Sequence, residues 1–108
     1  MSIEIVFETH ALSEDNERRV ATGWLPGRLS ERGRANAVEM GRRRRDGGIA
    51  AVFSSDLRRA AETAEIAFGD TGIPILYAWR LRECDFGSRN GSPAAEVKQD
   101  RLDYCDRP

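Results

Sequence analysis

Three short apolar runs, spaced along the chain, constrain its fold more than any other feature. They lie at 3–7, 49–53 and 73–77, are rich in β-branched and aromatic side chains, and are bounded by polar residues. Such runs predict strands, and the continuously apolar run at 49–53 predicts a strand that is buried on both faces. Pro74 favours a strand start or an edge position for the third run. We therefore expect a sheet of largely parallel strands.

Two helical segments separate these runs. Ser30 is a suitable N-cap for the first helix, with Glu31 in its first turn and Gly47-Gly48 at its end. One face of that helix carries small and apolar residues, which favour close packing against a sheet: Gly33, Ala37, Met40 and Gly41.

The second helix is expected to take its caps from Ser54-Ser55-Asp56 and to stop at Gly69. Its apolar stripe consists of Leu57, Ala60, Ala61, Ala64 and Ala67 or Phe68. We interpret residues 8–28 as a loop, the chain after Ala78 as mostly loop, and the stretch from Pro93 as a polar, helix-like tail.

Composition narrows the class of protein. The 108 residues suit one α/β domain over 1–108, and a net charge of −1 excludes a strongly basic nucleic-acid binder. No apolar run is long enough to span a membrane, and no secretion signal is seen at the N-terminus. Cys84 and Cys105 lack metal-ligand spacing, which favours a reducing, cytoplasmic location.

A polar residue follows each predicted strand, and the three residues suit the same kind of reaction. His10 follows the first strand, Arg59 follows the second and Glu83 follows the third, so all three are expected at one rim of the sheet. Imidazole is a nucleophile toward phosphorus, guanidinium pairs with phosphate oxygens, and a carboxyl group can protonate a leaving oxygen. These residue types suggest phosphoryl transfer through a covalent intermediate.

Three motifs make the prediction more specific. They are the run from His10 through Asn16 to Gly33, the segment Ser54-Ser55-Asp56-Leu57-Arg58-Arg59-Ala60 with Glu62-Thr63-Ala64, and Arg80-Leu81-Arg82-Glu83 with Phe86-Gly87 and Gly91. In order and spacing they resemble the histidine phosphatase superfamily, which is phosphoglycerate mutase-like. The resemblance implies a three-layer α/β sandwich with a mainly parallel sheet.

The resemblance also implies roles for individual residues. His10 would be the residue that is phosphorylated, and Glu83 would be the proton donor. Phosphate and substrate contacts would come from Arg59, Asn16, Gly23, Ser13 (which stands in place of a common threonine) and Thr9. No metal and no organic cofactor is expected, because imidazole and guanidinium supply the nucleophile and the charge.

The chain departs from the family pattern in three ways. Thr9-His10-Ala11 replaces the usual Arg-His-Gly, so one charged phosphate contact is lost, and Arg18, Arg19 and Arg82 are candidates to replace it. The second histidine of the family is not present, since His10 is the single histidine. We therefore expect the N-terminal part of a domain that is truncated at its C-terminal side. Its unpaired sheet edge would make homo-oligomerisation an option.

The predicted function is hydrolysis or transfer of a phosphate monoester through phospho-His10, with a phosphorylated small molecule as substrate. The alternative is a catalytically impaired or vestigial phosphate-binding domain of the same fold. A third hypothesis takes Arg42–Arg45 as an interaction patch. These arginines end a helix, where cations favour the dipole, so we expect a solvated helix end and no nucleic-acid or membrane partner.

Overall fold

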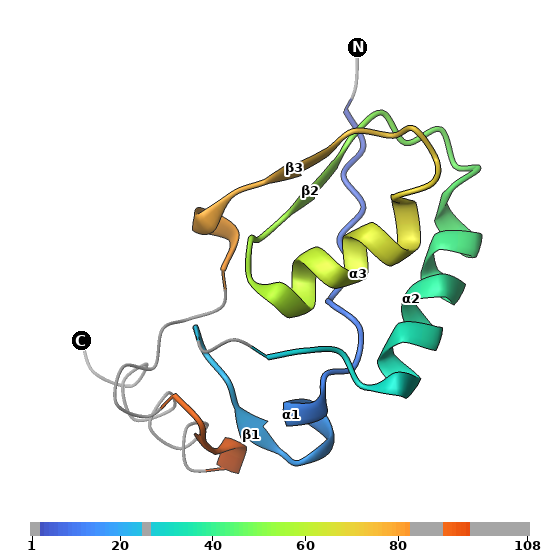
Figure 1. The fold of residues 1–108 in the computed structure, drawn as a ribbon. Coiled ribbons are helices and arrows are strands. Elements are labelled where there is room, and N and C mark those ends of the chain that lie inside the picture. Colours follow the sequence, from blue (N-terminus) through green and yellow to red (C-terminus); the bar gives the residue numbers. More distant parts are fainter. Residues whose placement is uncertain (1–2, 25–26, 83–89, 96–108) are drawn as a thin grey trace.

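The two longest helices lie beside a pair of parallel strands (Figure 1). The computed structural model describes residues 3–24, 27–82 and 90–95. Its elements, in chain order, are α1 (Glu14–Glu17), β1 (Val20–Ala21), α2 (Glu31–Arg44), β2 (Val52–Ser54), α3 (Arg58–Phe68), β3 (Ile75–Tyr77), the 3₁₀ turn η1 (Trp79–Leu81) and β4 (Ser92–Pro93).

The strands form two small sheets. β2 and β3 are parallel, with Val52 opposite Ile75 and Ser54 opposite Tyr77, and α3 is the crossover between them. β1 and β4 are antiparallel, with Val20 opposite Pro93. The β2–α3–β3 unit confirms the predicted α/β pattern, and Pro74 directly precedes β3 as expected.

Helix α2 begins where the sequence predicted. Ser30 is its N-cap and accepts a hydrogen bond from the Gly33 amide at 3.0 Å. The small residues on its buried face allow close approach, although the neighbours are backbone segments rather than a sheet. A Cβ on Gly33 would lie 1.7 Å from the Leu12 carbonyl oxygen.

The core is formed by these helices and the strand ends. Met40 of α2 packs with Ala67 and Phe68 of α3, and the partly buried apolar residues Ile49, Val52, Ile73 and Ile75 pack against them. A second, smaller cluster consists of Ala11, Leu29 and Ala37. Each cluster includes one residue of α2, so this helix packs against both the N-terminal segment and α3.

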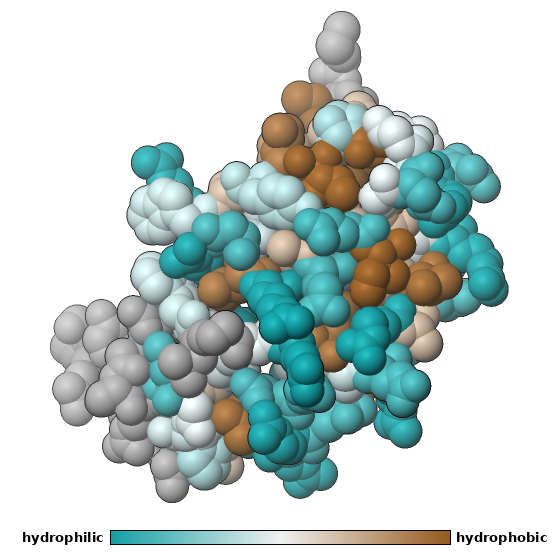
Figure 2. Space-filling view, viewed as in Figure 1, coloured by the Kyte–Doolittle hydropathy of each residue, from teal (hydrophilic) through white to brown (hydrophobic). Residues whose placement is uncertain are grey.

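Two strand predictions were wrong. Residues 3–7 form no strand, and the side chains of Ile3, Ile5 and Phe7 are 85–88% exposed. β2 begins only at Val52 and Phe53 is 68% exposed, so the 49–53 run is not buried on both faces. Apolar strands become buried only when neighbouring chain covers them, and among the described residues no backbone bond pairs 3–7 with β2. Figure 2 shows hydrophobic atoms at the surface near the N-terminal end of the chain.

Other local predictions also need correction. The segment predicted as loop at 8–28 contains α1 and β1. Helix α3 takes Leu57 as its N-cap without a side-chain hydrogen bond, so Ser54-Ser55-Asp56 do not cap it. Its predicted end is confirmed, because Gly69 is the C-cap. Pro93 lies in β4, so the predicted helix-like tail does not begin there; Ala94 and Ala95 are helical, and residues 96–108 lie outside the described part.

The consecutive arginines at the end of α2 all have acidic partners. Arg42 pairs with Glu39, Arg43 and Arg44 with Glu8, and Arg45 with Asp70, at nitrogen–oxygen distances of 2.8–3.9 Å. This pairing agrees with a solvated helix end. Within the residues that the structure describes, no helix is long and apolar enough to cross a membrane.

Candidate phosphate-transfer site

The imidazole of His10 is oriented by the backbone carbonyl of the next residue, Ala11. Its Nδ1 lies 2.7 Å from the carbonyl oxygen of Ala11. Since a carbonyl oxygen can only accept, Nδ1 must carry the proton and donate it. In the neutral imidazole the remaining nitrogen, Nε2, then holds the lone pair, which is the form that a nucleophilic histidine requires.

Thr63 fixes the chain next to His10. Its hydroxyl donates to the Arg59 carbonyl at 2.7 Å and accepts from the Ala11 amide at 3.0 Å. The side chain therefore connects α3 to the residue that holds the imidazole. No role was predicted for Thr63, although it occurs in one of the quoted motifs. The sequence did contain a signal for this role, because Thr63 lies one turn after Arg59 on the buried face of a helix.

Arg59 is a buried arginine on the first turn of α3. It is 4% exposed, and its Nη2 donates to the Gly23 carbonyl oxygen at 2.8 Å. Gly23 has φ of +59°, in the left-handed region that glycine adopts most readily, and this conformation belongs to the turn that presents its carbonyl. A buried guanidinium is a strong anion ligand, because its charge is little screened by water.

Asn16 and Ser13 form a capping box at the start of α1. The Ser13 hydroxyl accepts from the Asn16 amide at 3.0 Å, and Oδ1 of Asn16 accepts from the Ser13 amide at 2.9 Å. Because Oδ1 is engaged, the part of the Asn16 side chain left for a ligand is its NH2 group, a donor. Ser13 is fully buried, so its hydroxyl serves the cap.

The unusual neighbours of His10 are accommodated without strain. The Ala11 backbone does not lie in the left-handed region, and its methyl group is buried with Leu29 and Ala37. An alanine thus replaces the family's glycine here without a steric penalty. Thr9 is exposed and supplies no charge. Glu83, the predicted proton donor, lies outside the described residues.

The hydrogen bonds join several predicted residues into one cluster. His10 is linked through Ala11 and Thr63 to Arg59, and Arg59 is linked to Gly23. These contacts bring the loop after residue 10, the turn at Gly23 and the first turn of α3 to one place. An imidazole and a buried guanidinium are side chains of the types that phosphoryl transfer uses, and these bonds join the segments that carry them. In the described part of the chain, no three metal-ligating side chains cluster.

Two arginines near this cluster are held by carboxylates. Arg82 binds both carboxylate oxygens of Asp56, with Nε–Oδ1 at 2.5 Å and Nη2–Oδ2 at 2.7 Å, and its guanidinium lies 4.9 Å from the centre of the Trp24 ring. Arg18 binds Asp15 at 2.6 Å. Both guanidinium groups are thus paired with carboxylates of this chain.

The ion pairs of Asp56 and Glu14 allow us to predict how the stability of the chain depends on pH. The hydrogen bond from Arg82 holds the pKa of Asp56 below its ordinary value, and that from Arg28 lowers the pKa of Glu14. A lowered pKa in the folded state means that the unfolded chain binds more protons on acidification. The stabilisation is therefore present above the ordinary carboxyl pKa of about 4 and is lost as pH falls through the lowered values.

We expect the urea midpoint to fall as pH is lowered from about 6 to about 3, and to fall less in Asp56→Asn and Glu14→Gln. The difference in pH dependence between the parent and these variants should shrink in high salt, because both ion pairs are solvent-exposed. Glu17→Gln serves as the control, since Glu17 forms no ion pair among the described residues. Equal pH slopes in all variants would contradict the prediction.

Comparison with known proteins relates the sequence to histidine phosphatases and phosphoglycerate mutases. Residues 5–108 match the histidine phosphatase superfamily (branch 1). A 2,3-bisphosphoglycerate-dependent phosphoglycerate mutase of Streptococcus equi subsp. zooepidemicus is 33% identical over 102 residues, which is 90% of this chain and 44% of that protein. Its counterpart in Corynebacterium jeikeium is 37% identical over 99 residues, or 87% of this chain and 39% of that protein.

Solved structures show the same fold. YhfR of Bacillus stearothermophilus superposes with a TM-score of 0.76 at 37% identity and covers 86% of this chain and 46% of its own. A mycobacterial glucosyl-3-phosphoglycerate phosphatase gives 0.77 at 32% identity, covering 88% and 49%. The chain thus has the phosphoglycerate mutase-like α/β fold, and it spans less than half the length of the curated relatives it matches.

Proposed function

The chain belongs to the histidine phosphatase superfamily, and from that premise we propose that it acts on a phosphate monoester through a phosphohistidine at His10. The observation that carries the proposal is the hydrogen bond from Nδ1 to the Ala11 carbonyl, because it fixes the ring and, in the neutral imidazole, puts the lone pair on Nε2. Arg59, buried on the neighbouring helix turn, supplies the positive charge for the phosphate.

The proposed reaction has two steps. In the first, Nε2 of His10 forms a bond to phosphorus while the bond from phosphorus to the ester oxygen breaks, and the leaving oxygen takes a proton from an acid. Glu83 is our candidate for that acid. In the second step, a water oxygen bonds to phosphorus while the bond from phosphorus to Nε2 breaks; the carboxylate left in the first step takes a proton from the water, phosphate leaves, and Nε2 regains its lone pair. When an acceptor alcohol replaces the water, the same steps transfer the phosphoryl group.

The test is to locate the phosphoryl group after incubation with an aryl phosphate. We expect acid-labile phosphate on the peptide that contains His10, and none in His10→Gln. Because His10 is the single histidine of the chain, loss of phosphohistidine in that variant means that His10 is the residue that is phosphorylated. Arg58→Gln, which removes an exposed charge on the same helix as Arg59, is expected to label like the parent. Aryl alcohol release that continues unchanged in His10→Gln would overturn the proposal.

A second candidate function is phosphate binding without turnover. It is favoured by the neutral Thr9, which stands next to His10 in place of an arginine. This function predicts that inorganic phosphate binds the parent and His10→Gln with similar affinity and that no phosphohistidine forms. The same labelling experiment therefore decides between the two candidates.

A further inference from the structure

The hydroxyl of Thr63 is a buried polar group that forms two hydrogen bonds of opposite sense. The Arg59 carbonyl can only accept, so the hydroxyl proton points to that oxygen, at 2.7 Å. A lone pair of the same hydroxyl then accepts from the Ala11 amide at 3.0 Å. Thr63 is 5% exposed, so water has little access to replace either bond. The hydroxyl therefore connects the first turn of α3 to the residue that follows His10.

The Ala11 backbone is held on both sides of the carbonyl that receives the imidazole proton. On one side, Thr63 holds the Ala11 amide. On the other side, the carbonyl of Leu12 accepts from the Ser30 amide at 3.0 Å and from the Ser30 hydroxyl at 3.2 Å. The Ala11 methyl group is itself buried. The direction of the Ala11 carbonyl is thus set by α3 and by the N-cap of α2.

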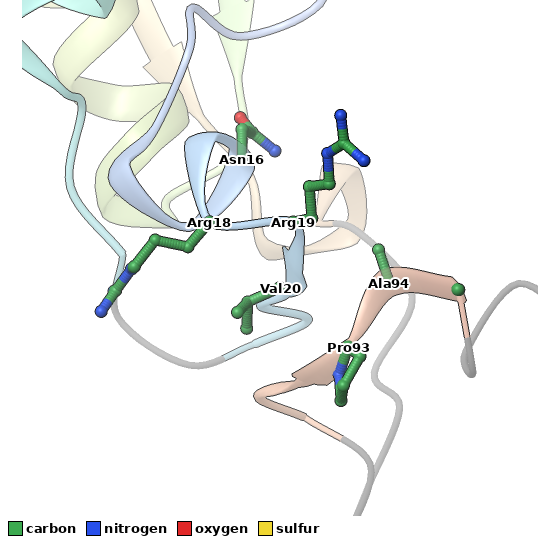
Figure 3. Close-up of a pocket in the computed structure, with 7 residues that line it drawn as sticks. Asn16, Arg18, Arg19, Val20, Pro93 and Ala94 are labelled. Atoms are coloured by element: carbon green, nitrogen blue, oxygen red, sulfur yellow. The ribbon is translucent and has the colours of Figure 1, made fainter.

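The pocket beside Asn16 takes no part in this support. It has a volume of about 510 Å³ and lies between Asn16, Arg19 and the β1–β4 pair (Figure 3). Within the described chain, no hydrogen bond joins the residues that line this pocket to His10, Ala11 or Thr63. The orientation of the imidazole is therefore set from α3 and not from the pocket.

The support from α3 bears on the position of the imidazole proton. In a neutral histidine free in water the proton prefers Nε2, the nitrogen that must be unprotonated for attack on phosphorus. A carbonyl oxygen held 2.7 Å from Nδ1 reverses this preference in His10, because it binds only a protonated Nδ1. A carbonyl that is free to turn away would release the ring and let the proton return to Nε2.

We propose that Thr63 is a positioning residue, whose hydroxyl keeps the proton of the neutral His10 imidazole on Nδ1 by holding Ala11 in place. Thr63 touches no reacting atom and acts through the backbone of Ala11. Its effect on phosphoryl transfer rests on the proposed phosphohistidine at His10. The position of the proton, in contrast, can be measured without any substrate.

Nitrogen NMR measures the two tautomers directly, because His10 is the single histidine of the chain. In the ¹⁵N-labelled full chain at about pH 9, where an ordinary imidazole is neutral, we expect the proton mainly on Nδ1 in the parent and in Thr63→Ser, which keeps the hydroxyl. In Thr63→Val and Thr63→Ala the ratio of Nδ1–H to Nε2–H should fall about fivefold, the effect of losing one ordinary hydrogen bond. Phosphohistidine should then form about tenfold more slowly from an aryl phosphate.

Thr71→Val is the matched control, since the Thr71 hydroxyl forms the same pair of bonds just after α3. It donates to the Phe68 carbonyl at 2.7 Å and accepts from the Ile73 amide at 3.1 Å. Its loss is the same chemical change in a place that has no hydrogen bond to His10 or Ala11. The tautomer ratio and the labelling rate should both stay as in the parent.

The inference is overturned by a parent imidazole whose proton lies on Nε2, or by a ratio that is unchanged in both Thr63→Val and Thr63→Ala. Because these two variants differ in size, the result does not depend on one of them folding. An equal shift in Thr63→Ser or Thr71→Val would mean a general packing effect and would also overturn it, as would a shifted ratio with an unchanged labelling rate. If the ratio shifts as expected but the parent forms no phosphohistidine, the proposed function fails and the hold of Thr63 on the imidazole stands.

Discussion

Gly33→Ala is expected to destabilise the chain by about 3 kcal/mol, although the same change on an ordinary helix surface stabilises by about 1 kcal/mol. The reason is the 1.7 Å separation that the new Cβ would have from the Leu12 carbonyl oxygen. That carbonyl also accepts from the Ser30 amide at 3.0 Å and from the Ser30 hydroxyl at 3.2 Å. Helix α2 would have to move away, and these bonds would break.

Urea denaturation measures this effect, and Gly47→Ala provides the matched control. A Cβ on Gly47 would lie 3.2 Å from the Arg44 carbonyl oxygen, a tight contact that a small shift relieves, so a change within about 1 kcal/mol is expected. Gly33→Ala should also weaken phosphate binding, because Leu12 lies between the residues that hold His10 and those that cap α1. A Gly33→Ala chain as stable as the parent would show that the N-terminal segment does not pack on α2 in this way.

The helices could be predicted from the sequence because their determinants are local. Ser30 caps α2 through the amide of Gly33, three residues along the chain, and Gly69 ends α3. Burial of the apolar runs could not be predicted, because it depends on what covers them. Phe7 and Phe53 are as apolar as buried strand residues but are 88% and 68% exposed, in a chain that spans less than half the length of its relatives.

The residue types of the candidate site were drawn from the motifs, whereas the hydrogen bonds that connect its segments could not be predicted. The motifs identified His10, Arg59, Asn16 and Gly23 by position, whereas the hydrogen bonds of Thr63 join segments 52 residues apart in sequence. Neither the periodicity of the sequence nor the spacing of its motifs predicts a hydrogen bond between such distant segments. The left-handed backbone of Arg19, with φ of +58°, was equally hidden, since the sequence there lacks the glycine that usually marks such a turn.

Arg59→Gln is expected to lower the affinity for inorganic phosphate about 10- to 100-fold, which corresponds to the roughly 1.5–3 kcal/mol of a charge-assisted hydrogen bond. Because Arg59 is 4% exposed, little solvent screening reduces this value. Arg59→Lys should recover only part of the affinity. A lysine keeps the charge but lacks the planar fork that allows an arginine to hold the Gly23 carbonyl and an anion together.

The neighbouring arginine makes the comparison specific. Arg58 lies one residue earlier on α3, but its side chain is 61% exposed and pairs with Glu62 at 3.6 Å. Arg58→Gln changes the net charge equally, so an effect that came only from the overall field would appear in both variants. Isothermal titration with phosphate should show the large loss only at Arg59, with urea midpoints confirming that both variants fold. Equal losses at the two positions would remove Arg59 from the phosphate site and leave its buried guanidinium with the structural role of holding the Gly23 turn.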